Sequence, residues 1–195
     1  LDMLAEATIL DVPTHKYTIA GHKMKKSVTE EAKSKRGFKE ESINLDNDIK
    51  RDGGTFIHSI MRDLMEFRFN KRGDLTAIRN RAKRGDVSGG FSIDKLQVDN
   101  LDLQAQELVK EIHAVQASIN KRTGTEGKAE IRTEAVVADF LKDIGGMEDV
   151  IVVYSDNTYD LIDFKTSGKN DPITYEDNKA VVRKNVFDTN TVNAY

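Results

Sequence analysis

The sequence predicts an α+β fold, in which helices pack on a mainly antiparallel sheet. Apolar residues recur at helical spacing through the middle of the chain. After them, three segments alternate as strands, and a polar turn joins the last two, as in an antiparallel hairpin. Helices followed by such a hairpin indicate the α+β class.

The composition narrows the class of protein further. The chain has 195 residues, 38% of them hydrophobic, with 30 Lys and Arg, 33 Asp and Glu, and no cysteine. This length allows one domain, or one domain with an appendage. The lack of cysteine excludes disulfides, thiolate zinc sites, iron–sulfur clusters and a cysteine nucleophile. No apolar run approaches the roughly 18 residues of a membrane span. We therefore expect a cytoplasmic protein, in the host cell if its source is viral, without a membrane partner.

The first predicted elements are a small hairpin and a helix start. Residues 14–19 alternate as a strand, and Gly21 supplies a turn. Ser27-Val28-Thr29, followed by two glutamates, predicts a helix whose first turn is capped by a hydroxyl. Residues 40–54 are polar and end in two glycines, which indicates a loop or a frayed helix.

Three helices are expected next. The first covers residues 55–69 with Thr55 as its cap, and the second covers about 75–83. A Gly-rich loop over residues 85–90 precedes the third helix, which covers about 100–120. The third helix is expected to turn five apolar side chains inward, namely Leu101, Leu103, Leu108, Ile112 and Val115.

Strands are predicted at residues 129–137, 149–154 and 159–165, and a final helix at about 175–186. The register of the hairpin is open. With a four-residue connection, Asp149 would lie opposite Phe164 and point away from Asp163, whereas an odd connection or a bulge would place it opposite Asp163. Asp163 and Lys165 share a face because they are two residues apart on one strand. A metal site requires the second register, and a salt-bridged sheet rim is the alternative.

Asp149, Asp163 and Lys165 are candidates for metal-dependent phosphate chemistry. Two converging carboxylates repel each other unless a cation lies between them, and Mg²⁺ is commonly held by one or two carboxylates plus water. A nearby lysine can orient the attacking water and stabilise charge on the phosphate.

Charge is unevenly distributed along the chain. Residues 16–39 hold eight Lys or Arg and two acids, residues 62–84 hold eight and three, and residues 134–195 hold twelve acids and six bases. A basic front half suits a bound polyanion, although a solvated charged face is the alternative. The candidates for contacts with a nucleic-acid backbone are Lys23, Lys25, Lys26, Arg79 and Arg81, with Lys83 and Arg84 beside them. Aromatic residues make up 7% of the chain, without tryptophan, so little base stacking or sequence specificity is expected.

Three motifs in the same order resemble those of the PD-(D/E)XK nuclease superfamily, in its RecB-like and phage exonuclease-like branch. Gly54-Thr55-Phe56-Ile57-His58 is similar to the Gly-Thr-x-x-His start of an early helix in that branch. Gly146-Met147-Glu148-Asp149 is similar to the Gly-x-x-Asp that opens its hairpin, and Asp163-Phe164-Lys165-Thr166 to the Asp-x-Lys-Thr of the second strand. Together the motifs span about 110 residues, which is more specific than any one alone.

The resemblance implies a restriction-endonuclease-like core over residues 54–195, after a basic lead-in over 1–53. It implies a metal-dependent deoxyribonuclease, exonuclease-like, that hydrolyses DNA in recombination, repair or phage DNA processing, with Mg²⁺ or Mn²⁺. Carried over by position, the metal-binding residues would be His58, Asp149, Asp163 and Phe164; the catalytic set would be Lys165 with Asp163, Asp149 and Glu134; and Thr166 would contact nucleic acid.

One departure from the family concerns the end of the chain. The branch usually has a Gln-x-x-x-Tyr helix after the lysine strand, and the nearest equivalent, Thr191 to Tyr195, lacks the glutamine. The chain is therefore expected either to be part of a larger parent polypeptide with possible protein partners, or to carry that helix elsewhere. Two alternatives to the DNA nuclease stay open: an RNA endonuclease of the same fold, and a nuclease-like module that binds nucleic acid or a partner without cutting.

Overall fold

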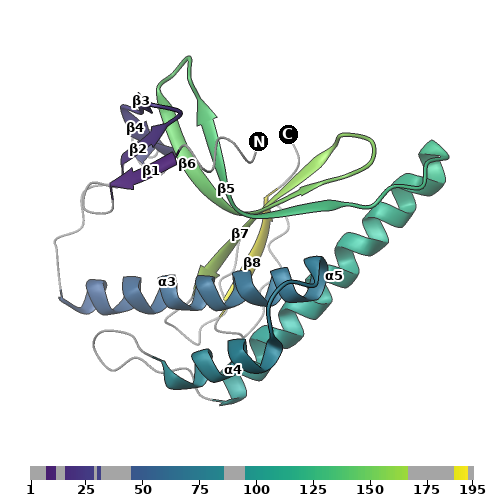
Figure 1. Cartoon of the computed structure of the whole chain (residues 1–195), viewed down its shortest axis with the longest axis horizontal. Helices are drawn as coiled ribbons and strands as arrows, with labels where there is room; N and C mark the ends of the chain where they lie inside the picture. Colours follow the sequence, from purple (N-terminus) through teal and green to yellow (C-terminus); the bar gives the residue numbers. More distant parts are fainter. Residues whose placement is uncertain are drawn as a thin grey trace, which may run out of the picture. The chain divides into compact units, whose positions relative to one another are not determined.

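A computed structural model describes residues 8–11, 16–28, 30–31, 45–85, 95–166 and 187–192. The chain forms two compact units. The smaller unit comprises Leu1–Ser42 with Glu134–Glu148, and the larger comprises Ile43–Thr133 with Asp149–Tyr195. The mixture of helices and mainly antiparallel strands confirms the α+β class (Figure 1). Within the described ranges, no helix combines the length and the apolar character needed to cross a membrane.

The smaller unit begins with short strands. β1 (Thr8–Asp11), β2 (Lys16–Ile19) and β3 (His22–Lys23) form an antiparallel sheet in that order. The turn between β2 and β3 passes through Gly21, whose φ of 79° lies in the region that glycine adopts most readily. The predicted hairpin with its glycine turn is therefore confirmed.

The helix start after this hairpin is also confirmed. The Ser27 hydroxyl accepts a hydrogen bond from the Glu30 amide at 3.1 Å, and the Ser27 amide donates to the Glu30 carboxylate at 2.7 Å. These reciprocal bonds are a capping box, which satisfies two amides at the beginning of a helix. Just before it, β4 (Lys26–Ser27) pairs in parallel with the beginning of β6 (Ile144–Val153).

Two glycines at the beginning of β6 allow this close pairing. A Cβ on Gly145 would lie 2.8 Å from Met24 Cγ, and one on Gly146 would lie 2.7 Å from Val28 Cγ2. Both distances are shorter than an ordinary van der Waals contact, so a side chain at either position would force Met24 or Val28 to shift. β6 begins five residues earlier than predicted, because these glycines belong to the strand and not to a loop before it.

The larger unit is built on three helices, α3 (Leu45–Met65), α4 (Leu75–Arg84) and α5 (Lys95–Thr123), which contact one another (Figure 1). A π-helical turn, η1 (Glu66–Asn70), continues α3, and Lys71 ends it in a left-handed conformation. Asp74 caps the start of α4, where its carboxylate accepts from the Thr76 amide at 2.9 Å, and Gly85 with φ of 54° caps the end.

Two predictions about the helices are wrong. Thr55 does not cap a helix start, because α3 begins ten residues earlier and continues through Gly53 and Gly54. Each internal glycine costs about 1 kcal/mol relative to alanine, but burial of the following turns holds the helix together. Leu103 and Val115 are exposed, whereas Leu101, Leu108 and Ile112 are buried as predicted. The buried stripe of α5 also contains Val98, Ala105, Gln116 and Ile119.

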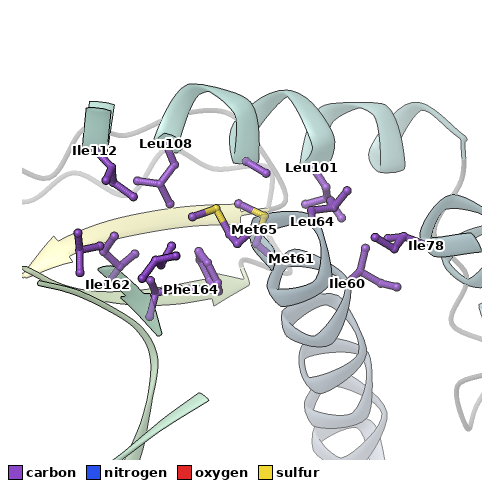
Figure 2. Close-up of a cluster of buried hydrophobic side chains, with 14 of the residues drawn as sticks. Ile60, Met61, Leu64, Met65, Ile78, Leu101, Leu108, Ile112, Ile162 and Phe164 are labelled. Atoms are coloured by element: carbon purple, nitrogen blue, oxygen red, sulfur yellow. The ribbon is translucent and has the colours of Figure 1, made fainter. Parts of the chain in front are cut away.

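The core of the larger unit lies between these helices and the hairpin strands. Figure 2 shows Met61 and Met65 of α3 close to Phe164, with Leu108 and Ile112 of α5 above the strand residues. All of these side chains are buried. Fully burying one large apolar side chain stabilises a fold by about 1.5–3 kcal/mol, so this cluster fixes the helices against the strands.

Four strands complete the sheet arrangement. β5 (Glu130–Asp139) pairs with β6, and both strands contribute residues to the two units. In the larger unit, β7 (Tyr159–Thr166) pairs antiparallel with the end of β6 on one side and with β8 (Phe187–Val192) on the other. The helix predicted at residues 175–186 lies outside the described residues, and β8 was not predicted. The predicted boundary after residue 53 falls inside α3, so it matches neither unit.

Candidate functional site

The connection between β6 and β7 decides the register of the candidate acids. Val153 lies opposite Tyr159 and Val150 opposite Ile162, which leaves a connection of residues 154–158. Tyr154 belongs to the turn, because its amide donates to the Thr158 carbonyl at 2.9 Å. Continued by one residue, this register brings Asp149 opposite Asp163. Of the two registers left open by the sequence, the structure has the one that a metal site requires.

The two faces of this hairpin differ in chemistry. Val150, Val152, Ile162 and Phe164 are buried and face the core. Because side chains alternate along a strand, Asp149 and Asp163 stand on the opposite face. The hairpin therefore anchors the acids by packing their neighbours, and leaves both carboxylates partly accessible.

Asp149 is held by three groups. One carboxylate oxygen, Oδ2, accepts from the Phe164 amide at 2.6 Å, and the other, Oδ1, lies 3.3 Å from Nδ1 of His58. The Asp163 carboxyl is also within hydrogen-bonding reach. Burial acts to raise the pKa of Asp149, but the hydrogen bond and charge of His58, together with the Phe164 amide and Asp163, bring that pKa below its usual value. Asp149 therefore favours its ionised form.

His58 reaches the acids from α3. Its neighbours Ile57, Ile60 and Met61 are buried in the core, whereas the His58 side chain keeps 30% of its surface exposed. The imidazole also meets the Phe164 ring edge-on, with ring centroids 6.1 Å apart. Contacts with the core thus fix the ring, while its Nδ1 faces a carboxylate instead of apolar side chains.

The remaining positions of the Asp-x-Lys-Thr motif follow on β7. The Phe164 side chain is buried among apolar residues, so only its backbone carbonyl could serve as a metal ligand. Lys165 and Thr166 are the last residues of β7, opposite Asp188 and Phe187 of β8. Their side chains lie outside the described part of the structure, and so does Tyr195.

The chemistry of the gathered side chains fits a hard divalent cation. Two carboxyl groups in hydrogen-bonding reach of each other must share a proton or a cation, and carboxylate oxygens with an imidazole suit Mg²⁺ or Mn²⁺. Over the described ranges, no three His, Asp or Glu side chains already enclose a possible ion position. Asp149, Asp163 and His58 are among the side chains to which this applies, so they lie near one another without forming a three-ligand site as they stand.

Glu134 lies on β5 and belongs to the smaller unit, whereas Asp149, Asp163 and His58 belong to the larger unit. Its backbone has φ of 48°, although it lies within a strand. A residue other than glycine, Asn or Asp in this left-handed region is uncommon and costs free energy. Such strain is a recurrent property of functional positions.

The candidate cations for nucleic acid divide into two kinds. Lys23, Lys25 and Lys26 are exposed on the smaller unit, where Lys25 pairs with Asp143 and Lys26 with Glu31. Arg79 and Arg81 are engaged within the larger unit by Asp102 at 2.6 Å and Asp63 at 2.9 Å. The two arginines join helices to each other, which makes them weaker candidates for contacts with DNA than the lysines.

A buried acid was missed by the sequence interpretation. Asp102 on α5 has a side chain that is 3% exposed, and it accepts hydrogen bonds from both Arg68 and Arg79. Its position could have predicted this, because Asp102 follows Leu101 in the apolar stripe of the helix. A charged side chain buried there needs a partner of opposite charge. Its role is structural, because two arginines already occupy its oxygens.

Comparison of the chain with models of known families, with curated proteins and with solved structures finds no match.

Proposed function

We propose that this protein is a divalent-metal-dependent deoxyribonuclease with a restriction-endonuclease-like core. The observation that carries the proposal is the register of β6 and β7, in which Val150 lies opposite Ile162. Continued by one residue, this register puts Asp149 and Asp163 on one face at opposed positions. His58, from a helix remote in sequence, contacts the Asp149 carboxylate through its Nδ1. These three residues come from the three motifs that resemble PD-(D/E)XK nucleases, and a register shifted by one residue would put the two acids on opposite faces of the hairpin.

The roles of the residues follow from their chemistry. Asp149 and Asp163 would hold Mg²⁺ or Mn²⁺, and His58 would act as a third ligand or orient Asp149. The bound ion would polarise the phosphodiester and lower the pKa of a water molecule. Lys165, two residues beyond Asp163, would orient the attacking water and stabilise charge developing on the phosphate. The Phe164 amide donates a hydrogen bond to Oδ2 of Asp149 and so fixes this carboxylate. The carboxylate would therefore need little reorganisation to bind the ion.

The test is cleavage of single- and double-stranded DNA, linear and circular, and of RNA, with Mg²⁺ or Mn²⁺. The intact protein is compared with Asp163→Asn, Asp149→Asn and Lys165→Ala. The matched controls are Asp99→Asn and Lys121→Ala, which change exposed residues on α5. We expect metal-dependent cutting of DNA that falls by about a hundredfold or more in the three site variants and is unchanged in the controls. Cutting of linear but not circular DNA would identify an exonuclease.

The contrary outcomes are distinct. Preferred cutting of RNA would indicate an RNA endonuclease of the same fold. Binding of DNA without cutting under either metal would indicate a non-catalytic module. Activity that survives in all three site variants would place the chemistry elsewhere or in a contaminant, and would overturn the assignment of these residues.

A further inference from the structure

The turn between β5 and β6 carries two apolar side chains into solvent. Leu141 is 99% exposed and Phe140 is 47% exposed, and we call this pair the apolar tip. Turns normally carry Gly, Asn, Asp, Ser or Pro at such positions. Packing within the smaller unit therefore does not explain why two adjacent large apolar residues stand at the end of this hairpin.

Hydrogen bonds and ion pairs hold the backbone beneath the tip. Asp139 Oδ1 accepts from the amides of Leu141 and Lys142, both at 3.1 Å, and its other oxygen pairs with the Lys142 ammonium at 2.9 Å. The Asp143 carboxylate binds His22 at 2.6 Å and Lys25 at 2.5 Å. These contacts fix the turn from both sides, so a ligand that covers the tip would not have to order it first.

The His22 ring also supports the tip directly. It meets the Phe140 ring edge-on, with centroids 5.9 Å apart. Aromatic pairs prefer this arrangement. Phe140 is thus held by one edge while about half of its surface stays open, and Leu141 projects beyond it.

The charges around the tip are layered. The side chains of Lys25, Lys142 and Lys26 are 80%, 70% and 52% exposed, whereas their partners Asp143, Asp139 and Glu31 are 18%, 39% and 22% exposed. Lys23 is exposed as well. The ammonium groups are therefore more exposed to solvent than the carboxylates they pair with, so the most exposed charge that flanks the tip is positive. Exposed ion pairs contribute little stability, which leaves these lysines available to an incoming polyanion.

We propose that the apolar tip inserts between base pairs of bound DNA while the flanking lysines hold the phosphates on either side. Apolar side chains that wedge into a base step, next to cations on the backbone, are a known way for proteins to open or kink a duplex. A nucleic acid presents apolar base faces between closely spaced negative charges, which matches apolar side chains flanked by lysines. This inference rests on the proposed function, because it supplies the DNA contact that such a nuclease needs.

The experiment uses a DNA duplex with 2-aminopurine near one end and a chelator that prevents cutting. The fluorescence of 2-aminopurine rises when the base is unstacked. The intact protein should raise the fluorescence, while Leu141→Ser and Phe140→Ser should abolish the rise and weaken binding by about tenfold, as expected for the loss of one stacked base. Leu103→Ser, which changes an exposed leucine on α5, is the matched control and should behave like the intact protein. Thermal unfolding of each variant checks that the fold is retained.

The outcomes separate this inference from the proposed function. If the intact protein binds and cuts DNA without a rise in fluorescence, the tip is not a wedge and the nuclease stands. A fluorescence rise that depends on Leu141, without cutting when metal is added, supports the wedge and overturns the nuclease. If sedimentation shows that the intact protein self-associates and Leu141→Ser does not, the tip is covered by a second copy, and the inference is wrong.

Discussion

Asp102 shows how one buried charge organises the helices of the larger unit. Its two oxygens accept hydrogen bonds from Arg68 of η1 and Arg79 of α4, so a single side chain of α5 joins three elements. The arginines are partly exposed, whereas the carboxylate is not. Asp102, Arg68 and Arg79 stabilise the fold only together, because an arginine that lost its acid would remain charged among packed helices.

Replacement of Asp102 by alanine is expected to lower the free energy of unfolding by about 3 kcal/mol. The loss comes from two guanidinium groups left without their partner. Urea unfolding followed by circular dichroism would measure it, with Asp99→Ala, an exposed acid of the same helix, as the control. The control should change stability by less than about 0.5 kcal/mol. Equal effects of the two substitutions would contradict a special role for Asp102.

His58 offers a residue-scale test of metal ligation as distinct from packing. If the imidazole is a ligand, His58→Ala should weaken Mn²⁺ binding by about tenfold or more, and should reduce Mn²⁺ affinity more than Mg²⁺ affinity because nitrogen ligands favour the transition metal. Titration calorimetry with each metal would measure both affinities. His113→Ala, which removes an exposed histidine stacked on Phe69, is the control. An equal loss for the two metals would assign His58 to the orientation of Asp149.

Among the elements, the β6–β7 hairpin separates what the sequence could predict from what it could not. Alternation identified both strands, and the acids stood out because strand positions near a core are usually apolar. The register stayed open because Tyr154 can either extend the strand or enter the turn. Its amide bonds to the Thr158 carbonyl and its hydroxyl to Asp160, contacts that only the folded chain displays.

The helices show a similar limit. The existence of three helices was predicted from spacing, and so was the burial of Leu101, Leu108 and Ile112, but the burial predicted for Leu103 and Val115 was wrong. Periodicity alone does not distinguish an apolar stripe from one that buries polar residues, and α5 buries both Asp102 and Gln116. These side chains have tertiary partners, two arginines and Ser155, which spacing along the sequence does not reveal.

The connection between α5 and β5 depends on one glycine. A Cβ on Gly127 would lie 2.6 Å from the Cβ of Ser155, and neither atom can move without the backbone. Asn120 donates to the Gly127 carbonyl at 2.8 Å, and Gln116 donates to the Ser155 hydroxyl at 2.8 Å. The end of α5 and the turn after β6 are thus held in contact around this position.

Gly127→Ala is expected to destabilise the protein by about 1–3 kcal/mol, the usual cost of overpacking. Ser155→Gly should also destabilise it, through the lost hydrogen bonds, but the double variant should be more stable than the sum of the two changes predicts. Chemical denaturation of all four proteins gives this coupling free energy. A coupling near zero would show that the clash is relieved in another way.

The chain builds its smaller unit from two segments that residues 43–133 separate in the sequence. The lead-in strands and residues 134–148 share it, and the amides of Lys25 and Lys26 donate to the Asp143 carbonyl. Sequence patterns describe neighbours along the chain, so they predicted the hairpin and the helix start but not their pairing with β6. The division of the chain into units could be recognised only from these long-range contacts.

Gly145→Ala is expected to loosen the smaller unit selectively. The added methyl group would lie 2.8 Å from Met24 and 3.0 Å from Ile19, both of which are buried in that unit. Hydrogen exchange should therefore quicken by about tenfold at the amides of β2 and β4, while the amides of α3 and α5 keep their protection. Faster exchange throughout the protein would show instead that the two units unfold as one.

The five-residue connection after β6 also constrains how this protein can diversify. Changes of sequence within residues 154–158 leave the pairing of Asp149 and Asp163 intact, but the gain or loss of one residue exchanges the two faces of β7 unless a bulge compensates. Relatives that keep the acids functional should therefore differ in the length of this connection by even numbers of residues. A single-residue insertion there, without a compensating bulge, would put the two acids on opposite faces of the hairpin while the sequence keeps both of them.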